Sequence, residues 1–128
     1  LFPYTTLFRS GFSIMTEANI QDQSHEFILA AEGQWVDIEA GDSSSGNKKA
    51  KLVDKIVNQW GRAGVAAERL QQLLNHASPS VRLAAASHLI NFGGADLATP
   101  VLKELSKSPV GLISSFADTV LRVRKLAD

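Results

Sequence analysis

The chain has 128 residues, with thirteen Lys and Arg against thirteen Asp and Glu, 45% hydrophobic residues and no cysteine. This composition is typical of one globular domain and leaves no room for a second. It excludes a disulfide framework, a thiolate metal site and a cysteine nucleophile, so stability must come from a buried apolar core. No apolar run reaches the roughly 18 residues of a membrane helix, and the N-terminus lacks the apolar stretch of a secretion signal. We therefore expect a cytoplasmic protein of bacterial type that does not associate with membranes.

The first ten residues differ in character from the rest of the chain. They read LFPYTTLFRS, which looks like the translation of a common sequencing-adapter oligonucleotide, so they are excluded from the fold prediction. On this interpretation Met15 is the natural start. We expect residues 1–14 to be an artefactual or disordered extension and residues 15–128 to be a single helical domain. An adapter at an open end also indicates a metagenomic source.

Charge is distributed unevenly along the chain. Residues 11–47 hold seven acids and no Lys or Arg, whereas residues 48–128 hold twelve bases and six acids. Two interpretations stay open: an acidic first helix packs beside a Lys-bearing second helix with most charges solvated, or the bipolar surface steers a partner. We expect the acids of the first helix to lie close enough to Lys48, Lys51 and Lys55 to offset their field.

Apolar residues recur with helical spacing almost everywhere after Met15, and no segment shows the alternation of a strand. A first helix is predicted over about residues 18–40, ended by Gly41 and Asp42. Its apolar stripe comprises Ile20, Phe27, Ile28, Ala31, Trp35 and Ile38. A polar linker is expected over residues 43–47, with Asn47 as the N-cap of a second helix. That helix is closed by Gly61 and Gly64 and carries Leu52, Val53, Ile56, Val57 and Trp60.

Four shorter helices complete the predicted all-α fold. The third carries Leu70, Leu73 and Leu74, and the fourth begins at residues 78–80 around Pro79 and stops at Gly93. For the fifth we expect Asp96 as the N-cap, which places Pro100 in the first turn, where its missing N–H costs little. The sixth contains Ile113, Phe116, Val120 and Val123, with basic residues at the negative end of its dipole.

An internal repeat links the last four helices. A shift of 31 residues aligns Leu70 with Val101, Leu74 with Leu105, Val81 with Leu112, Ala85 with Phe116 and Leu89 with Val120. The turn prolines Pro79 and Pro109 agree within one position. Tandem pairs of short helices are the unit of an alpha-solenoid, in which each pair buries its face against its neighbours.

Residues 76–89 read HASPSVRLAAASHL. This segment resembles the second-helix signature of a HEAT-type repeat, with a proline, then Val81 and Arg82, then paired alanines and a leucine. The wider chain, over about residues 18–126, is similar to a small bacterial helical family known as domain of unknown function two thousand and nineteen. The matching positions are Gly41-Asp42, Asn47-Lys48, and Val81-Arg82 with Ala84-Ala85. The resemblance implies a compact HEAT-like alpha-alpha superhelix and an association with immunity or adaptor roles.

The motifs for chemistry are missing. The segment GDSSSGNKK at residues 41–49 is a near miss to a phosphate-binding loop, because Asn47 precedes the lysine, Lys49 stands where a hydroxyl is needed, and the loop follows a helix. The three histidines, His25, His76 and His88, form no metal-ligand pair on a helix face. We expect His76 to compensate a helix dipole and His88 to be partly buried. Because no Gly-x-Ser-x-Gly elbow occurs either, we expect no cofactor, no metal and no enzyme activity.

Four residues are candidates for partner binding: Arg82, His88, Trp60 and Lys48. In a solenoid an arginine at the position of Arg82 packs its stem along the next helix and pairs with an acid or carbonyl of an adjacent repeat, and partner contact is the alternative use. Trp35 and Trp60 lie on apolar stripes typical of a core, and an exposed rim would let either anchor an interface.

The predicted function is a non-enzymatic protein-interaction module, whose concave face is built from the second helices of the repeats and holds a protein partner. An immunity or adaptor protein would act by steric occlusion. The alternative is a HEAT-like nucleic-acid-binding protein that uses the basic 48–128 region. Against it, the bases are spread along the chain and are not interleaved with exposed aromatic residues.

Overall fold

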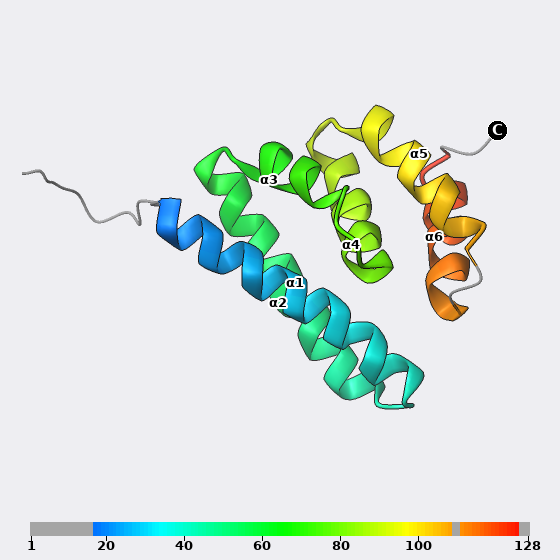
Figure 1. Cartoon of the computed structure of the whole chain (residues 1–128). Helices are drawn as coiled ribbons and strands as arrows, with labels where there is room; N and C mark the ends of the chain where they lie inside the picture. The colour runs from blue at the N-terminus through cyan, green and yellow to red at the C-terminus, as the bar shows by residue number, and fades with distance from the viewer. Residues whose placement is uncertain (1–16, 109–110, 126–128) are drawn as a thin grey trace, which may run out of the picture.

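The computed structural model describes residues 17–108 and 111–125, with side chains from residue 23 onward. Over these residues the chain is all-α and has no strand, as predicted (Figure 1). The elements are α1 (Glu17–Glu39), α2 (Ser43–Ala63), α3 (Ala66–Leu73), α4 (Pro79–Leu89), the 3-10 turn η1 (Ile90–Phe92), α5 (Ala95–Ser106) and α6 (Gly111–Val123). The predictions for residues 1–14, for the Ile20 side chain and for Pro109 lie outside the described residues.

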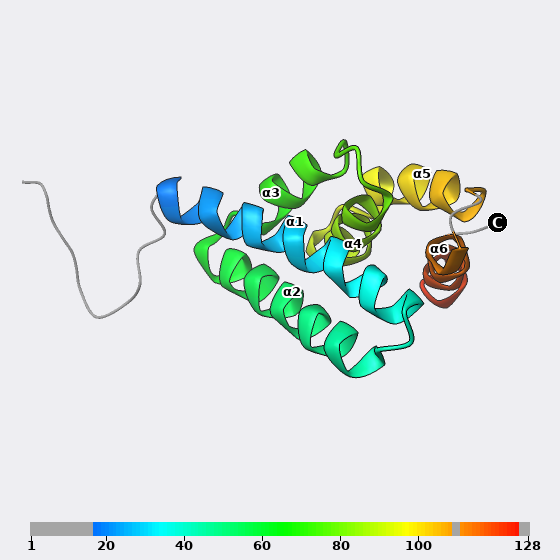
Figure 2. The same ribbon diagram turned by 60° about the horizontal axis from the view of Figure 1, so that its bottom comes forward.

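The two long helices α1 and α2 lie side by side as an antiparallel pair (Figure 1). Helix α4 occupies the middle of the molecule, with this pair on one side and α5 and α6 on the other (Figure 2). It contacts α1, α3, α5 and α6. The α5–α6 pair therefore stacks onto the α1–α2 pair through α4, whereas α3 contacts both α2 and α4.

The predicted linker at residues 43–47 is wrong, because these residues form the first turns of α2. Asp42, and not Asn47, is the N-cap, since a carboxylate oxygen of Asp42 accepts a hydrogen bond from the Ser45 N–H at 3.1 Å. This hydrogen bond lowers the pKa of Asp42. Gly46 is buried, and a Cβ there would lie 2.8 Å from a side-chain carbon of Ile38. The absence of a side chain at Gly46 thus allows α1 and α2 to approach closely.

The end of α2 and the start of α5 show how the helix boundaries are set. Helix α2 continues through Gly61 and ends at Gly64, which adopts the left-handed conformation with φ 77°. Helix α5 begins earlier than predicted, with Gly94 as its N-cap, because the Ala98 N–H donates to the Gly94 carbonyl at 2.9 Å. Pro100 consequently lies in the second turn, and the first-turn placement after Asp96 is wrong.

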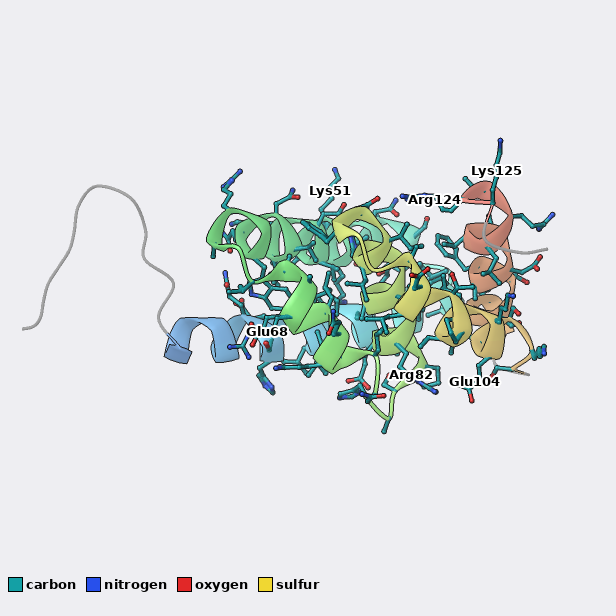
Figure 3. All side chains as sticks on the ribbon, turned by 90° about the horizontal axis from the view of Figure 1, so that it is seen from above. Lys51, Glu68, Arg82, Glu104, Arg124 and Lys125 are labelled. Carbon is teal, nitrogen blue, oxygen red and sulfur yellow. The ribbon has the colours of Figure 1, made fainter. Side chains whose placement is uncertain are left out.

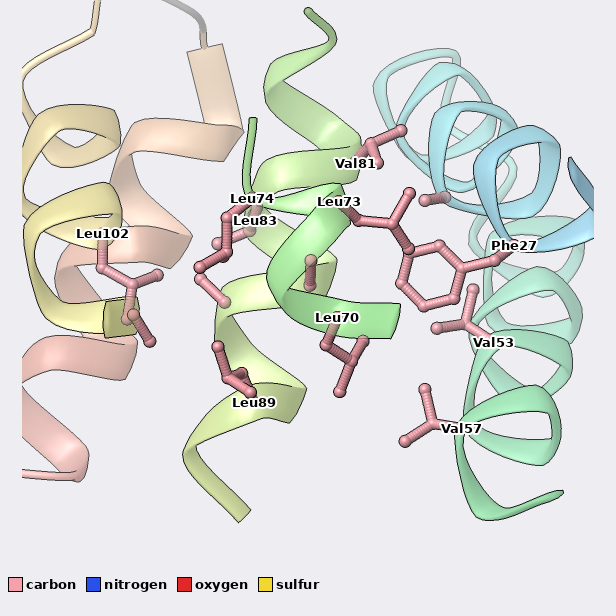
Figure 4. Close-up of a cluster of buried hydrophobic side chains, with 14 of the residues drawn as sticks. Phe27, Val53, Val57, Leu70, Leu73, Leu74, Val81, Leu83, Leu89 and Leu102 are labelled. Atoms are coloured by element: carbon pink, nitrogen blue, oxygen red, sulfur yellow. The ribbon is translucent and has the colours of Figure 1, made fainter. Parts of the chain in front are cut away.

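The core is one apolar cluster contributed by α1 to α6. Figure 4 shows side chains from several helices pointing into it, among them Phe27, Leu70 and Leu102. Trp60 is fully buried and stacks on Phe27, with ring centroids 5.6 Å apart and an interplanar angle of 22°. Three predicted stripe residues are exposed instead, namely Leu52, Phe116 and Val123.

The internal repeat has a different register from the predicted one. A shift of 32 residues places buried positions of α3 and α4 on buried positions of α5 and α6, namely Ala66 on Ala98, Leu70 on Leu102, Leu73 on Leu105, Val81 on Ile113, Ala85 on Ala117 and Leu89 on Leu121. The 31-residue shift is wrong, because it aligns buried Ala85 with Phe116, which is 49% exposed. The 31-residue shift aligns Leu89 with Val120 and the 32-residue shift aligns it with Leu121. Because both partners are aliphatic, residue type does not distinguish the two registers, whereas burial does.

Candidate partner-binding groove

A groove of about 180 Å³ opens between the second helices of the three helix pairs and the C-terminal half of α1. Its lining residues are Gln34 and Trp35 of α1, Ala50, Val53 and Asp54 of α2, Leu83, Ala84, Ser87 and His88 of α4, and Phe116 of α6. Most of these side chains are apolar, with a few polar groups at fixed places.

One wall of the groove is aromatic. Trp35 is nearly buried and meets Phe116 edge to face, with ring centroids 5.3 Å apart and an interplanar angle of 75°. Phe116 itself belongs to an exposed apolar stripe on α6, formed by Leu112, Phe116 and Val123, which are 47%, 49% and 70% exposed. The stripe continues the apolar surface of the groove along α6.

The polar part of the groove is centred on His88. Its Nε2 lies 3.3 Å from Oδ1 of Asp54, and its side chain is three-quarters buried between α4 and α2. Burial lowers the pKa of His88, because the charged imidazolium loses water, and the nearby Asp54 carboxylate opposes this shift. His88 is therefore partly buried, as predicted, and it lines the groove. The hydroxyl oxygen of Ser87 is also buried there, with no hydrogen-bond partner among the described residues.

Because the pKa of His88 is lowered in the folded protein, we expect the free energy of unfolding to depend on pH. Below its ordinary pKa of 6.5, the unfolded chain binds a proton at this residue before the folded chain does. The free energy of unfolding should then fall as the pH drops through this value toward the lower folded pKa. His88→Gln is expected to remove this part of the pH dependence in urea unfolding measured at a series of pH values. An unchanged slope in His88→Gln would contradict the prediction.

A basic stripe follows the solvent-facing side of α2 next to the groove. It consists of Lys48, Lys51, Lys55 and Arg62, all exposed and, within the described part of the chain, without an ion pair. A second hollow, of about 360 Å³, is lined by three of these bases together with Asp54, Asn58 and Gln59. Figure 3 shows Lys51 projecting on the same side of the molecule as Arg124 and Lys125.

No ion pair among the described residues joins an acid of α1 to this stripe, and the expected offset of its field stays a prediction. Asp37 of α1 pairs with Lys49, which lies over Gly33 on the side of α2 that faces α1. Lys51 and Lys55 fall about 160° and 120° away from Lys49 around the helix, since each residue turns by about 100°. The field of the basic stripe is therefore directed to solvent. Near α2, the charge is asymmetric across the helix.

The other predicted site residues lie outside the groove. Trp60 is fully buried, so it presents no surface to a partner, and its assignment as a binding residue is corrected to a core role. Arg82 has its Nη1 3.7 Å from Oε1 of Glu104 on α5, as the structural interpretation predicted. It projects on the side opposite Lys51 (Figure 3). Near the turn before α4, Nδ1 of His76 accepts the Ser78 N–H at 3.0 Å, so this residue closes a turn and the expected dipole role is replaced.

Sequence reasoning missed Asp54 and Phe116 as site residues. Asp54 is one acid within a basic helix, and nothing local distinguishes it. Phe116 carried a signal: with the 32-residue register it aligns with the small residue Ala84, so an aromatic group stands where the preceding pair has alanine.

No group of three His, Asp or Glu in the described ranges could hold a metal ion. Within the same ranges, no helix combines the length and the apolarity needed to cross a bilayer. Comparisons with protein-family models, with curated proteins and with solved structures find no match for this chain. The resemblance to HEAT repeats and to the bacterial helical family therefore stays a prediction.

Proposed function

We propose that this protein is a non-enzymatic protein-interaction module and that the groove beside Phe116 is its partner-binding surface. The observation that carries the proposal is the convergence of the second helices α2, α4 and α6 on one apolar groove. It is bordered by a helix that exposes Leu112, Phe116 and Val123 in a row. Exposed apolar side chains that lie together on one face are typical of a protein-interaction surface.

The groove is lined by the same set of helices as the predicted concave surface of a solenoid, which is also built from the second helices of the repeats. A module of this kind acts by covering a surface of its partner. The proposed role is that of an immunity or adaptor protein that blocks its partner sterically in the bacterial cytoplasm. The polar groups of the groove are few. The His88 imidazole faces the Asp54 carboxylate, and the buried Ser87 hydroxyl has no hydrogen-bond partner among the described residues.

Selection from a displayed peptide library against the purified protein tests the proposal. Phe116→Ser removes the exposed ring and serves as the counter-target. We expect enriched peptides that bind the wild-type chain and lose at least about tenfold in affinity for the variant. Leu97→Ser, at a half-exposed position of α5 outside the groove, is the matched control and should bind like the wild type.

The proposal fails if no selected peptide distinguishes Phe116→Ser from the wild type. It also fails if a labelled random duplex binds with a dissociation constant well below about 10⁻⁶ M at about 0.15 M salt, the edge of ordinary non-specific binding. That result would favour the nucleic-acid alternative, which is supported by the exposed Lys and Arg side chains of α2.

A further inference from the structure

The apolar groove and the basic hollow of α2 meet at Asp54, which lines both. On one side of this residue stand Trp35 and Phe116, and on the other Lys51 and Lys55. A ligand that covers both hollows must offer apolar groups to the first and negative charge to the second. We infer that the partner segment is an acidic amphipathic helix, and this inference rests on the proposed function.

Charge complementarity supports an acidic occupant. The four bases of the stripe are exposed, carry no ion pair in the described residues, and succeed one another at helical spacings of three, four and seven residues along α2. A helix laid along α2 repeats its side chains with the same rise, so its Glu or Asp residues meet successive bases. The charged C-terminal end of α6 lies on the same side, as Arg124 and Lys125 show (Figure 3).

The apolar part of the surface selects a protein segment over a nucleic acid. Leu112 and Val123 are aliphatic, so of the three stripe residues on α6 only Phe116 offers a stacking face to a base, and none offers a donor to a phosphate. An acidic amphipathic helix meets both requirements of the surface. Its apolar residues enter the groove at the i, i+4 and i+7 spacing of helix-in-groove complexes, and its acids face the bases of the second hollow.

Three labelled peptides test this inference. Each is about 16 residues long, roughly four helical turns, with the same Leu and Phe residues on one face. They differ only at the flanking positions, which are Glu, Gln or Lys. Fluorescence anisotropy with the full chain measures their dissociation constants at about 0.05 M and about 0.3 M salt, since surface charges are screened at the higher concentration.

The Glu peptide is expected to bind about tenfold or more tightly than the Gln peptide at low salt, with the Lys peptide weakest and the differences reduced at high salt. The double variant Lys51→Glu, Lys55→Glu should lose the preference for the Glu peptide and keep the affinity for the Gln peptide. The double variant Lys103→Glu, Lys107→Glu changes the charge equally on α5, outside both hollows, and should keep the preference.

The possible negative results distinguish a failure of the acidic-partner inference from a failure of the proposed protein-binding function. Equal binding of the Glu and Gln peptides, both abolished by Phe116→Ser, would overturn the acidic partner and leave the protein-binding groove in place. Binding that ignores Phe116→Ser would overturn both. Displacement of the Glu peptide by a random duplex would assign the basic hollow to nucleic acid and would also overturn the inference.

A second copy of this chain is the remaining competitor for the groove. The outer face of α1 exposes Leu29 and Val36, with Glu32 and Glu39 on the same helix. Sedimentation of the wild-type chain should show a monomer. A dimer that Phe116→Ser converts to a monomer would show that α1 of another copy fills the groove, and would overturn the inference of a separate acidic partner.

Discussion

Trp60→Ala is expected to lower the free energy of unfolding by about 3–5 kcal/mol, the usual cost of deleting a buried tryptophan. Trp60 is fully buried on α2 and stacks on Phe27 of α1, so its removal opens a cavity between the two longest helices. Urea unfolding followed by circular dichroism measures the effect. A loss below about 0.5 kcal/mol, typical of a surface substitution, would contradict the core role.

Trp60→Phe is the matched control for this prediction. The indole Nε1 has no hydrogen-bond partner in the described residues, so a phenyl ring gives up no hydrogen bond and retains most of the contact with Phe27. We expect a smaller loss of stability than for Trp60→Ala. Because Trp60 does not line the groove, the folded Phe variant should bind the selected peptides as the wild type does.

Leu89→Ala is expected to lower the free energy of unfolding by about 2–5 kcal/mol. Leu89 is fully buried in α4, the helix that contacts both the α1–α2 side and the α5–α6 side of the molecule. Its isobutyl group lies against Gly94, the N-cap of α5, where a Cβ would come within 2.3 Å of the Leu89 Cγ. Urea unfolding of the variant measures the loss.

A double-mutant cycle with Gly94→Ala makes this prediction sharper. Gly94 has φ −103°, a conformation open to alanine, so the cost of Gly94→Ala arises from the clash with Leu89. In the double variant the clash is gone, and the combined loss should fall short of the sum by about 0.5–3 kcal/mol, the usual coupling of residues in contact. Strict additivity would show that the two residues do not pack together.

The acidic segment 11–47 and the basic segment 48–128 do not neutralise each other through ion pairs across the described α1–α2 contact, apart from one pair. The acidic and basic segments do form the adjacent helices α1 and α2, yet the single ion pair described between them uses Asp37 and Lys49. Because the remaining bases of α2 face solvent, the charge difference is available to a partner. For the acidic partner proposed above, these bases would make the association rate depend on salt.

The sequence by itself determined the helical class and most of the helix boundaries. Helical spacing of apolar residues, Pro79 at the start of α4, and Gly64 and Gly93 at helix ends act within one or two turns of the chain. Such signals can be read locally. The buried stripes that contain Phe27 and Leu89 followed from the same periodicity.

The start of α2 follows from a local signal, since Asp42 caps the helix through the Ser45 N–H. Only the tertiary structure decided which register the repeat has and which residues share the groove. The groove joins Trp35, Asp54, His88 and Phe116 from four helices. Their proximity depends on how the helices pack across the core, and contacts between residues so distant in the chain leave no local pattern to read.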